Sequence, residues 1–237
     1  MTPQLTLVIP VYNEADNIRG VFDAIRDRIG GLSLRVLVVY DFDGDTTVPV
    51  VERIMGEYPF EAVLVKNTFG RGAVNAIKTG FASAVSEAVL VVMADLSDDL
   101  SAANRMYEMI RGGCDVVCGS RYMKGGGQVG GPVVKKTISR IAGLSLRFLT
   151  GIPTHDVTNS FKMYRRQLLE RLQLESDGGF EIGMEITVKA FVSGSRVCEV
   201  PTVWRDREGG VSRFRLFRWM PKYLKWYFYA LRRRFIR

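Results

Sequence analysis

Five short runs of almost continuous apolar residues occur in the first half of the chain. Such runs are typical of strands in a parallel sheet that is buried on both faces. We therefore expect strands at residues 5–9, 34–40, 61–65, 88–94 and 115–119. Segments with helical periodicity separate them, and one apolar helix face is formed by Ile18, Val21, Phe22, Ile25 and Ile29. The alternation of strand and helix predicts an α/β fold with a doubly wound sheet.

Polar residues and a proline indicate where the predicted helices begin. Asn13 is a suitable N-cap for the first helix, and the segment 45–47, followed by Pro49, starts the second. Two more helices are expected at 71–85 and 99–112. In the second half of the chain we expect helices at 132–150 and about 180–193, and a strand at about 196–203.

Polar side chains follow the predicted strands at the points where the strands end. They are Asn13, Glu14, Asp41, Asp43, Asn67, Asp95, Ser120 and Arg121. Since the carboxyl ends of parallel strands share one edge of the sheet, these side chains should converge where doubly wound sheets bind ligands. Acids predominate among them, which favours a ligand with a metal ion or a ribose over a bare phosphate.

Composition changes this picture at one place, the C-terminal end. The chain has 237 residues, of which 47% are hydrophobic and 24% charged, so it can bury the core of one large domain. Its net charge of +8 is concentrated in residues 205–237, which hold eleven Lys/Arg and two Asp/Glu. The remainder is nearly neutral, which excludes an evenly basic nucleic-acid-binding protein.

The three cysteines, Cys114, Cys118 and Cys198, form no recognisable disulfide or zinc pattern. We interpret them as buried free thiols, which suit a reducing compartment. The sequence opens on MTPQLTLVIPVYNE, in which we see no secretory signal. The longest apolar run, residues 88–94, is far shorter than the ~18 residues that a transmembrane helix needs, so we expect no membrane span.

Five motifs occur along nearly the whole chain: VIPVYNE at 8–14, GSRY at 119–122, KKTISR at 135–140, DVTNSFKMYRR at 156–166 and EVPTVWRDREGGVSR at 199–213. In order and spacing they resemble family 2 glycosyltransferases of the GT-A fold, especially the dolichyl-phosphate mannose synthase-like branch. The resemblance implies a Rossmann-like, doubly wound mixed sheet. It also implies transfer of a sugar from a nucleotide sugar to a polyprenyl (dolichyl or undecaprenyl) phosphate, with inversion at the anomeric carbon. The donor, GDP-mannose or a UDP-hexose, is left open by the sequence.

The resemblance implies that the nucleoside is held by Pro10, Tyr12, Glu14 and Asp41. Glu14 has a second interpretation, an acid that favours the first turn of a helix. The family pattern D-D-G-S-x-D-G-T is changed here to YDFDGDTT, so Tyr40 replaces its first acid. The resemblance therefore gives the location of the nucleoside more firmly than its contacts.

A change also affects the D-x-D motif with which the family holds a divalent ion against the diphosphate. The corresponding triplet is MAD at 93–95, and a methionine thioether is a poor ligand for a hard cation. We expect Mg²⁺ or Mn²⁺ to be retained by Asp95 with Ser97 or Asp98, because Mg²⁺ commonly uses only one or two protein carboxylates. Weaker metal dependence is the alternative. Asp98 could instead cap the next helix, a role that we favour for Asp99.

On the acceptor side the resemblance implies a basic set that brings a lipid phosphate next to the sugar diphosphate. Its members are Arg121, Lys135, Ser139, Arg140 and Arg207. The catalytic residues are expected to be Asp95, Arg121 and Arg207. An ionised phosphate needs no protein base to become a nucleophile. We therefore interpret His155 as a turn residue and Asp156 as a residue that orients the acceptor site.

The predicted organisation is a transferase domain at 1–212, with a nucleotide-sugar half at about 1–122 and an acceptor half at about 123–212, and a basic aromatic tail at 213–237. Apolar residues recur at helical spacing in the tail, typical of a helix on an anionic membrane surface. A helix that packs onto the domain is the other interpretation, and a membrane-protein partner would also provide attachment. With 132–150 as a second interfacial helix, we expect a peripheral protein at the cytoplasmic face of a membrane.

Two other functions fit parts of the sequence. A transferase with a saccharide acceptor would need a general base and would not need the cations near Arg121 and Arg207. A degenerate transferase that serves as a membrane-bound scaffold would explain Met93 and Tyr40. The acidic strand ends have no purpose in a nucleic-acid-binding protein, so we expect no nucleic acid partner.

Overall fold

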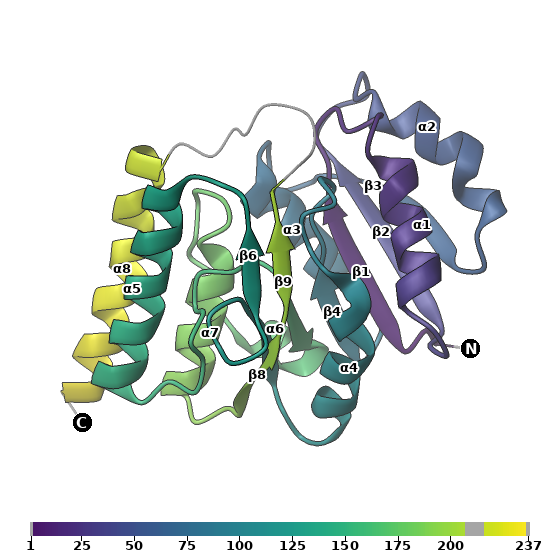
Figure 1. Cartoon of the computed structure of the whole chain (residues 1–237). Coiled ribbons are helices and arrows are strands. Elements are labelled where there is room, and N and C mark those ends of the chain that lie inside the picture. Colours follow the sequence, from purple (N-terminus) through teal and green to yellow (C-terminus); the bar gives the residue numbers. More distant parts are fainter. Residues whose placement is uncertain (1, 207–215, 236–237) are drawn as a thin grey trace.

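A seven-stranded sheet forms the middle of the computed structural model, which describes residues 2–206 and 216–235 (Figure 1). Its order is β3-β2-β1-β4-β7-β5-β8. The strands are β1 (Leu5–Pro10), β2 (Leu34–Tyr40), β3 (Glu61–Lys66), β4 (Ala88–Val91), β5 (Val116–Ser120), β7 (Lys162–Arg165) and β8 (Val197–Pro201). Only β7 is antiparallel to its neighbours, so all the other strands point their carboxyl ends to one edge. The predicted mixed, doubly wound sheet is confirmed.

Helices cover both faces of this sheet. They are α1 (Ile18–Arg28), α2 (Thr47–Ile54), α3 (Ala73–Ser83), α4 (Ala103–Arg111), α5 (Val133–Thr150), α6 (Arg166–Arg171), α7 (Ile182–Val192) and α8 (Leu216–Phe235), with 3-10 turns η1 (Met55–Glu57) and η2 (Leu100–Ala102). Successive side chains of β1 point to opposite faces of the sheet. Leu7 and Ile9 pack with α1, α2 and α4 on one face, whereas Val8 packs with α3, α6 and α7 on the other. The core therefore has two layers, one on each face.

The structure differs from the predicted strands at three places: two short strands were not expected, and one predicted strand is divided. β7 lies in the DVTNSFKMYRR segment, where no strand was expected, because its four residues are too short and too polar to show a pattern. The strand predicted at 196–203 is divided: Val197–Pro201 joins the large sheet as β8, and β9 (Val203–Arg205) pairs with β6 (Gly127–Val129) in a small parallel sheet. The other five predicted strands are confirmed, although the fourth ends at Val91.

Asn13 is not the N-cap of the first helix, contrary to the prediction. The helix begins at Ile18 after Asn17, whose side chain makes no capping hydrogen bond. Asn13 instead adopts a left-handed backbone with φ 55°, and its Oδ1 accepts a hydrogen bond from the Thr46 N–H at 3.1 Å. Asparagine tolerates this conformation better than most residues. Its short side chain thus connects the β1–α1 loop to the start of α2.

The interpretation of three free thiols is wrong for two of them. Cys114 precedes β5 and Cys198 lies in β8, and the two form a disulfide across these neighbouring strands. Cys118 is free and buried, as predicted. The 84 residues between the bonded cysteines concealed the pairing, since only the strand order brings them together. The inference of a reducing compartment therefore loses its basis.

The tail helix α8 packs beside α5 and against α7 (Figure 1, yellow beside teal). Trp226 and Ala230 of α8 are buried in a third apolar cluster with Leu146 of α5 and Met184 of α7. The packing interpretation is therefore correct for one face of the helix, while Leu224 and Phe228 on another face remain exposed. No helix in the described part of the chain is long and apolar enough to span a membrane.

Close packing of α3 on β1 depends on Gly80. A Cβ at this position would overlap Cγ1 of Val8, a buried β-branched side chain that cannot move away easily. We expect Gly80→Ala to lower the free energy of unfolding by ~1–3 kcal/mol, because overpacking outweighs the better helix propensity of alanine. Gly56→Ala is the matched control, since no atom lies within 4 Å of the added Cβ. Equal chemical denaturation midpoints for the two variants would contradict this account.

Candidate active site

The carboxyl edge of the sheet brings together the loops that follow β1, β2, β4 and β5. Because β1 lies between β2 and β4, the loop after β1 is flanked by Asp41 on one side and by the acidic segment 95–98 on the other. β5 is parallel to β4 across the antiparallel β7, so Arg121 also emerges at this edge. The predicted convergence of the strand-end residues in 2–206 is confirmed.

The loop after β1 is fixed by the start of α2. Asp45 is buried, and its Oδ1 and Oδ2 accept hydrogen bonds from the Asn13 N–H at 3.1 and 3.2 Å. Thr47 Oγ1 accepts one from the Glu14 N–H at 2.9 Å. The Glu14 carboxylate accepts a bond from Asn17 Nδ2 at 2.7 Å. These contacts hold the segment that carries Tyr12 and Glu14 in one conformation over the sheet edge.

An aromatic surface lies beside this loop. The rings of Tyr12 and Phe42 are 5.4 Å apart and inclined by 55°, and the Arg71 guanidinium lies 5.8 Å from the centre of the Phe42 ring. Asp41 accepts hydrogen bonds from Asn67 Nδ2 and from the Gly72 N–H, each at 2.8 Å. Asp41 thus orders the loop that carries Arg71, and Tyr12, which is 44% exposed, keeps an accessible ring. Such rings can stack on a nucleobase.

The acidic loop after β4 has a strained and tightly bonded backbone. Leu96 has φ 60°, a conformation that costs a leucine of order 1 kcal/mol and that is concentrated at functional sites. Asp95 Oδ1 accepts a hydrogen bond from the Ser97 N–H at 3.2 Å, and Asp98 Oδ2 accepts one from the Met93 N–H at 3.1 Å. Ser97 is nearly buried. Asp98 is therefore not a helix cap, whereas Asp99, which accepts from the Ser101 N–H at 3.0 Å, is one as predicted.

Burial and the neighbouring charge of Asp95 raise the pKa of Asp98 to about 7, although the Met93 hydrogen bond and the charge of Arg121 act to lower it. Two carboxylates in electrostatic contact form a place where a divalent cation would be favoured. No group of three or more His, Cys, Asp or Glu suited to a metal occurs in 2–206 and 216–235. Asp95 and Asp98 are the two carboxylates of this loop that lie near each other, and two carboxylates suit an ion that completes its coordination with diphosphate oxygens and water.

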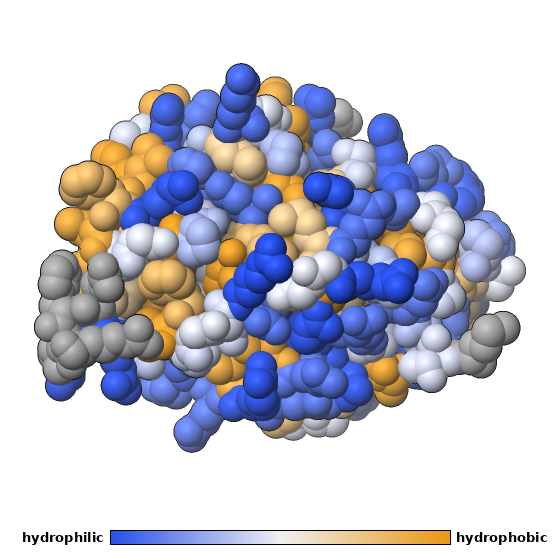
Figure 2. Space-filling model, turned by 90° about the horizontal axis from the view of Figure 1, so that it is seen from below, coloured by the Kyte–Doolittle hydropathy of each residue, from blue (hydrophilic) through white to orange (hydrophobic). Residues whose placement is uncertain are grey.

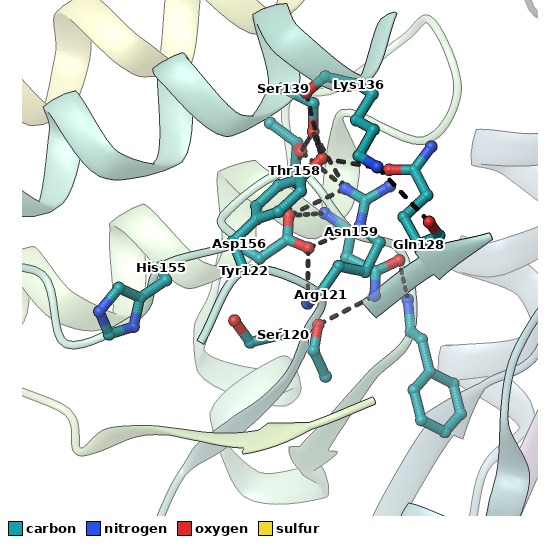
Figure 3. Close-up of polar contacts among 12 residues, drawn as sticks. Ser120, Arg121, Tyr122, Gln128, Lys136, Ser139, His155, Asp156, Thr158 and Asn159 are labelled. Carbon is teal, nitrogen blue, oxygen red and sulfur yellow. Dashed lines mark hydrogen bonds and ion pairs between the residues drawn. The ribbon is translucent and has the colours of Figure 1, made fainter. Parts of the chain in front are cut away.

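Arg121 is the centre of a buried polar network (Figure 3). Its Nε and one terminal nitrogen donate to the two carboxylate oxygens of Asp156 at 2.6 and 2.9 Å, and its backbone N–H adds a third bond. The same terminal nitrogen reaches Ser139 of α5 at 3.0 Å and Thr158 at 3.3 Å. Asp156 is fully buried and the Arg121 side chain is 9% exposed. The predicted orienting role of Asp156 agrees with this geometry.

Burial disfavours the charged forms of both Arg121 and Asp156, but the charge of each residue stabilises the charge of the other. Asp156 raises the pKa of Arg121 above its ordinary value, and Arg121 holds the pKa of Asp156 below its own. Beneath the pair lies Lys162 of β7, fully buried, whose Nζ donates to the carbonyls of Val157 and Asn159. Burial lowers the pKa of Lys162. These bonds shape the 156–160 loop that presents Asp156.

A basic pocket of about 270 Å³ opens beside Arg121. It is lined by Arg121, Tyr122, Met123, Gly126, Gly127, Gln128, Lys136 and Arg140. Three of these side chains are cations and none is an acid. Lys136 Nζ lies 3.5 Å from the Gln128 carbonyl, whereas Lys135, the predicted phosphate ligand, lies 5.9 Å from the centre of the Trp204 ring and lines no part of this pocket. Arg207 lies outside the described residues.

Helical periodicity could have identified Lys136. Lys136, Ser139 and Arg140 are spaced i, i+3 and i+4, which places them on one side of a helix, whereas Lys135 is rotated by about 100° from Lys136. The motif points to Lys135, whereas Lys136 is the lysine that lines the pocket, and the phosphate-binding role of Lys135 stays a prediction. Tyr122, whose hydroxyl donates to Ser139 Oγ at 3.1 Å, was not among the predicted site residues.

Three further polar side chains near the site make contacts that stabilise the surrounding structure. The ring of His155 points away from the network, and its Nδ1 lies 2.6 Å from Glu199 (Figure 3). Glu181 accepts bonds from the N–H groups of Gly178 and Gly179. Glu185 pairs with Lys189 and accepts bonds from two backbone N–H groups. These residues shape the loops around the site.

A family model, glycosyl transferase family 2, matches residues 6–173. The chain belongs to this family. The matched region contains the fixed β1 loop, the acidic loop and the Arg121 network. The predicted family membership, drawn from the five motifs, is therefore confirmed, and so is the prediction that the protein is a glycosyltransferase.

Several curated proteins are similar to this family 2 transferase along most of its length. It is 29% identical to a dolichol-phosphate mannosyltransferase of Pyrococcus furiosus over 94% of this chain, and spans 64% of that protein. It is 30% identical to a polyprenol monophosphomannose synthase of Mycolicibacterium smegmatis (90% of this chain, 81% of that protein). An undecaprenyl-phosphate mannosyltransferase of Micrococcus luteus is 31% identical (87% and 85%).

Solved structures support the same fold. Glucosyl-3-phosphoglycerate synthase from Mycobacterium tuberculosis, in complex with Mn²⁺, UDP-glucose and phosphoglyceric acid, superimposes with a TM-score of 0.72 at 16% identity. The match covers 97% of this chain and 80% of that chain. At this identity the similarity establishes the GT-A fold and no shared substrate.

The buried pair of the transferase leads to a stability prediction. We expect Asp156→Asn to lower the free energy of unfolding by about 3 kcal/mol, because it leaves the buried Arg121 charge without its counter-ion. Since the native pKa of Asp156 is lowered, its contribution is present above the ordinary pKa of about 4 and is lost as the pH falls through the native value. The difference between variant and parent should therefore shrink in acid.

Denaturant unfolding at pH 7 and at pH 3 measures this difference. Glu57→Gln is the control, because Glu57 pairs with Arg19 at the surface and contributes little. A difference for Asp156→Asn that stays constant between the two pH values would contradict the charge-pair explanation.

Proposed function

We propose that this transferase moves a sugar from a nucleotide sugar to a polyprenyl phosphate, with inversion at the anomeric carbon. The names of three relatives at 29–31% identity, each a polyprenyl- or dolichyl-phosphate mannosyltransferase, support this acceptor class. They also favour mannose as the transferred sugar. Because such an acceptor resides in a bilayer, the proposal includes a peripheral location at a membrane surface.

The observation that carries the proposal is the position of the basic pocket next to a hydrophobic helix. Lys136 and Arg140 belong to α5, the same helix that exposes Ile141 and Phe148. An acceptor with a phosphate at one end and a long hydrocarbon chain at the other matches this combination. A free saccharide would gain nothing from exposed isoleucine and phenylalanine.

The acceptor phosphate is itself the nucleophile in this proposal. It is ionised at neutral pH, and cations on the pocket wall would hold it against the donor diphosphate, which also bears negative charge. The attack forms the new bond between a phosphate oxygen and the anomeric carbon as the bond to the nucleoside diphosphate breaks. The residues that line the pocket include no carboxylate and no histidine, which suits a reaction without a general base.

On the donor side, Tyr12 and Phe42 would stack on the base, and Asp95 with Asp98 would hold Mg²⁺ or Mn²⁺. When bound, such an ion supplies positive charge that stabilises the leaving diphosphate. We assign the principal contact with the ion to Asp95, the acid of the motif triplet, and supporting contacts to Ser97 and Asp98, whose positions in the loop are fixed by hydrogen bonds.

The metal site leads to a direct test. We expect Asp95→Asn to reduce turnover about 100-fold or more, because an amide no longer holds the ion that neutralises the leaving group. Asp99→Asn is the control, since Asp99 caps a 3-10 turn. The measurement is nucleoside diphosphate release from a panel of GDP- and UDP-sugars with a polyprenyl phosphate, with Mg²⁺, with Mn²⁺ and with a chelator.

Each outcome of this panel has a distinct meaning. Release that needs both lipid and metal supports the proposal and identifies the donor. Release that needs lipid but ignores the chelator would contradict the metal assignment alone. Absence of release and of nucleotide binding for every donor would contradict the enzyme and favour the scaffold.

The pocket leads to a second test on adjacent residues. We expect Lys136→Gln to raise the KM for polyprenyl phosphate about tenfold with a smaller effect on the KM for the donor, because it removes one cation from the pocket wall. Lys135→Gln removes the same charge one residue away, where the side chain contacts Trp204. A larger effect for Lys135 than for Lys136 would restore the assignment made from the motif.

A further inference from the structure

Lys162 is a buried lysine to which the proposed reaction gives no role. It lies in β7, between β4 and β5, and its side chain is 0% exposed. Hydrophilic residues cover much of the molecular face in Figure 2, where water solvates their charges. Lys162 has no such contact with water, and lysine is rarely fully buried unless it is paired. Because burying an ammonium group is costly, its presence in the middle of the sheet calls for a physical reason.

The ammonium group of Lys162 is held in one place. Its Nζ donates to the carbonyl oxygen of Val157 at 3.0 Å and to that of Asn159. A Cβ at Gly183 of α7 would lie 3.6 Å from Nζ, so the helix packs close to the ammonium group. The side chain is thus enclosed by the sheet, the 156–160 loop and α7, and its charge cannot move toward solvent.

Lys162, Asp156 and Arg121 act on one another through their charges. Burial acts to raise the pKa of Asp156, but Arg121 and Lys162 together hold it below its ordinary value. Burial lowers the pKa of Lys162, whereas the Asp156 carboxylate and the two carbonyl acceptors favour its protonated form. Cys118 pairs with Lys162 across the strands, but burial raises the pKa of its thiol, so Cys118 adds no negative charge at neutral pH.

The sum of these charges decides how strongly the cluster attracts an anion. A guanidinium paired with one carboxylate has no net charge, and a neutral pair attracts a phosphate only weakly. With Lys162 included, two positive charges meet one negative charge, and the cluster is positive. Arg121 lines the basic pocket, so the excess charge acts at the pocket wall. Asp98 also acts on Arg121, but it belongs to the acidic loop, where the proposed cation would balance it.

We propose that Lys162 supplies the net positive charge of this cluster, so that Arg121, although it is paired with Asp156, still attracts the acceptor phosphate. Lys162 does not line the pocket, so it acts through Arg121 and is not a catalytic residue. The identity of the anion as a lipid phosphate rests on the proposed function. The effect of the charge applies to any phosphate that enters the pocket.

Two substitutions separate the charge of Lys162 from its hydrogen bonds. Lys162→Gln removes the charge and keeps N–H donors for the carbonyl oxygens, whereas Lys162→Arg keeps the charge. We expect Lys162→Gln to weaken the binding of inorganic phosphate and of farnesyl phosphate about five- to tenfold, because one charge near the anion is lost. Lys162→Arg should bind both nearly as tightly as the parent. Calorimetry measures the affinities, and circular dichroism verifies that each variant is folded.

Lys78→Gln is the matched control. Lys78 Nζ also donates to a backbone carbonyl, that of Ser176 at 2.7 Å, but it belongs to α3 and takes no part in the Arg121 network. Its substitution should leave phosphate binding unchanged. Lys136→Gln, on the pocket wall, should weaken the binding of phosphate and so verify that the phosphate occupies this pocket.

A second measurement needs no ligand. Asp156→Asn leaves Arg121 and Lys162 as two buried positive charges without the carboxylate that offsets them. Lys162→Met should therefore lower the denaturation midpoint less in the Asp156→Asn variant than in the parent, or raise it. Equal shifts in the two backgrounds would mean that the side chains do not interact through charge, which contradicts the proposal.

The binding experiment has other outcomes that would overturn the proposal. A Lys162→Gln variant that binds phosphate as tightly as the parent would mean that Lys162 only supports the 156–160 loop through hydrogen bonds. Equal loss in folded Lys162→Gln and Lys162→Arg variants would mean that shape matters and charge does not. A parent protein that binds no phosphate would leave the charge without a purpose.

The proposed function can fail separately from the role of Lys162. If the farnesyl chain adds no affinity over inorganic phosphate and no sugar is transferred to polyprenyl phosphate, the lipid acceptor is wrong. Weaker phosphate binding by Lys162→Gln in the same experiment would still support the charge of Lys162 as part of an anion site.

Discussion

The ion pair between Arg121 and Asp156 connects the parts of the molecule that must act together. Arg121 directly follows β5, Asp156 precedes β7, and the same guanidinium reaches Ser139 of α5. A buried charge pair is tolerated only when its hydrogen bonds are satisfied. The need to satisfy these hydrogen bonds therefore holds the end of β5, the loop before β7 and helix α5 in one arrangement. The basic pocket lies beside it.

The position of α5 follows from this constraint and from Gly143. A Cβ at Gly143 would overlap the carbonyl oxygen of His155, so the helix can approach the loop that carries Asp156 only because residue 143 is a glycine. Once α5 is held there, Lys136 and Arg140 face the pocket and Phe148 is left at the surface. One helix thus provides a cationic flank toward the site and an apolar stripe toward the outside.

The sequence predicts the sheet well because its central strands are buried on both faces and read as uninterrupted apolar runs, as in β1. It fails where an element depends on distant neighbours. β7 is four residues long and includes the buried Lys162, so no local pattern marks it. The Cys114–Cys198 disulfide likewise depends on the pairing of β5 with β8. At the site, motif positions located the pocket, but the direction of each side chain on α5, which separates Lys136 from Lys135, is a property of the helix.

The methionine in the acidic motif illustrates how a local contact can compensate for a lost residue. Asp98 folds back so that its Oδ2 lies 3.1 Å from the Met93 nitrogen, which brings a carboxylate to the backbone of the position where the family's first acid would stand. The left-handed turn at Leu96 makes this return possible within five residues. Since the charge of Asp95 raises the pKa of Asp98, the two side chains lie close together, and a loop with one acid in its motif presents two carboxylates at the sheet edge. The number of oxygen ligands available to a cation there depends on the conformation of the loop as well as on the D-x-D sequence motif.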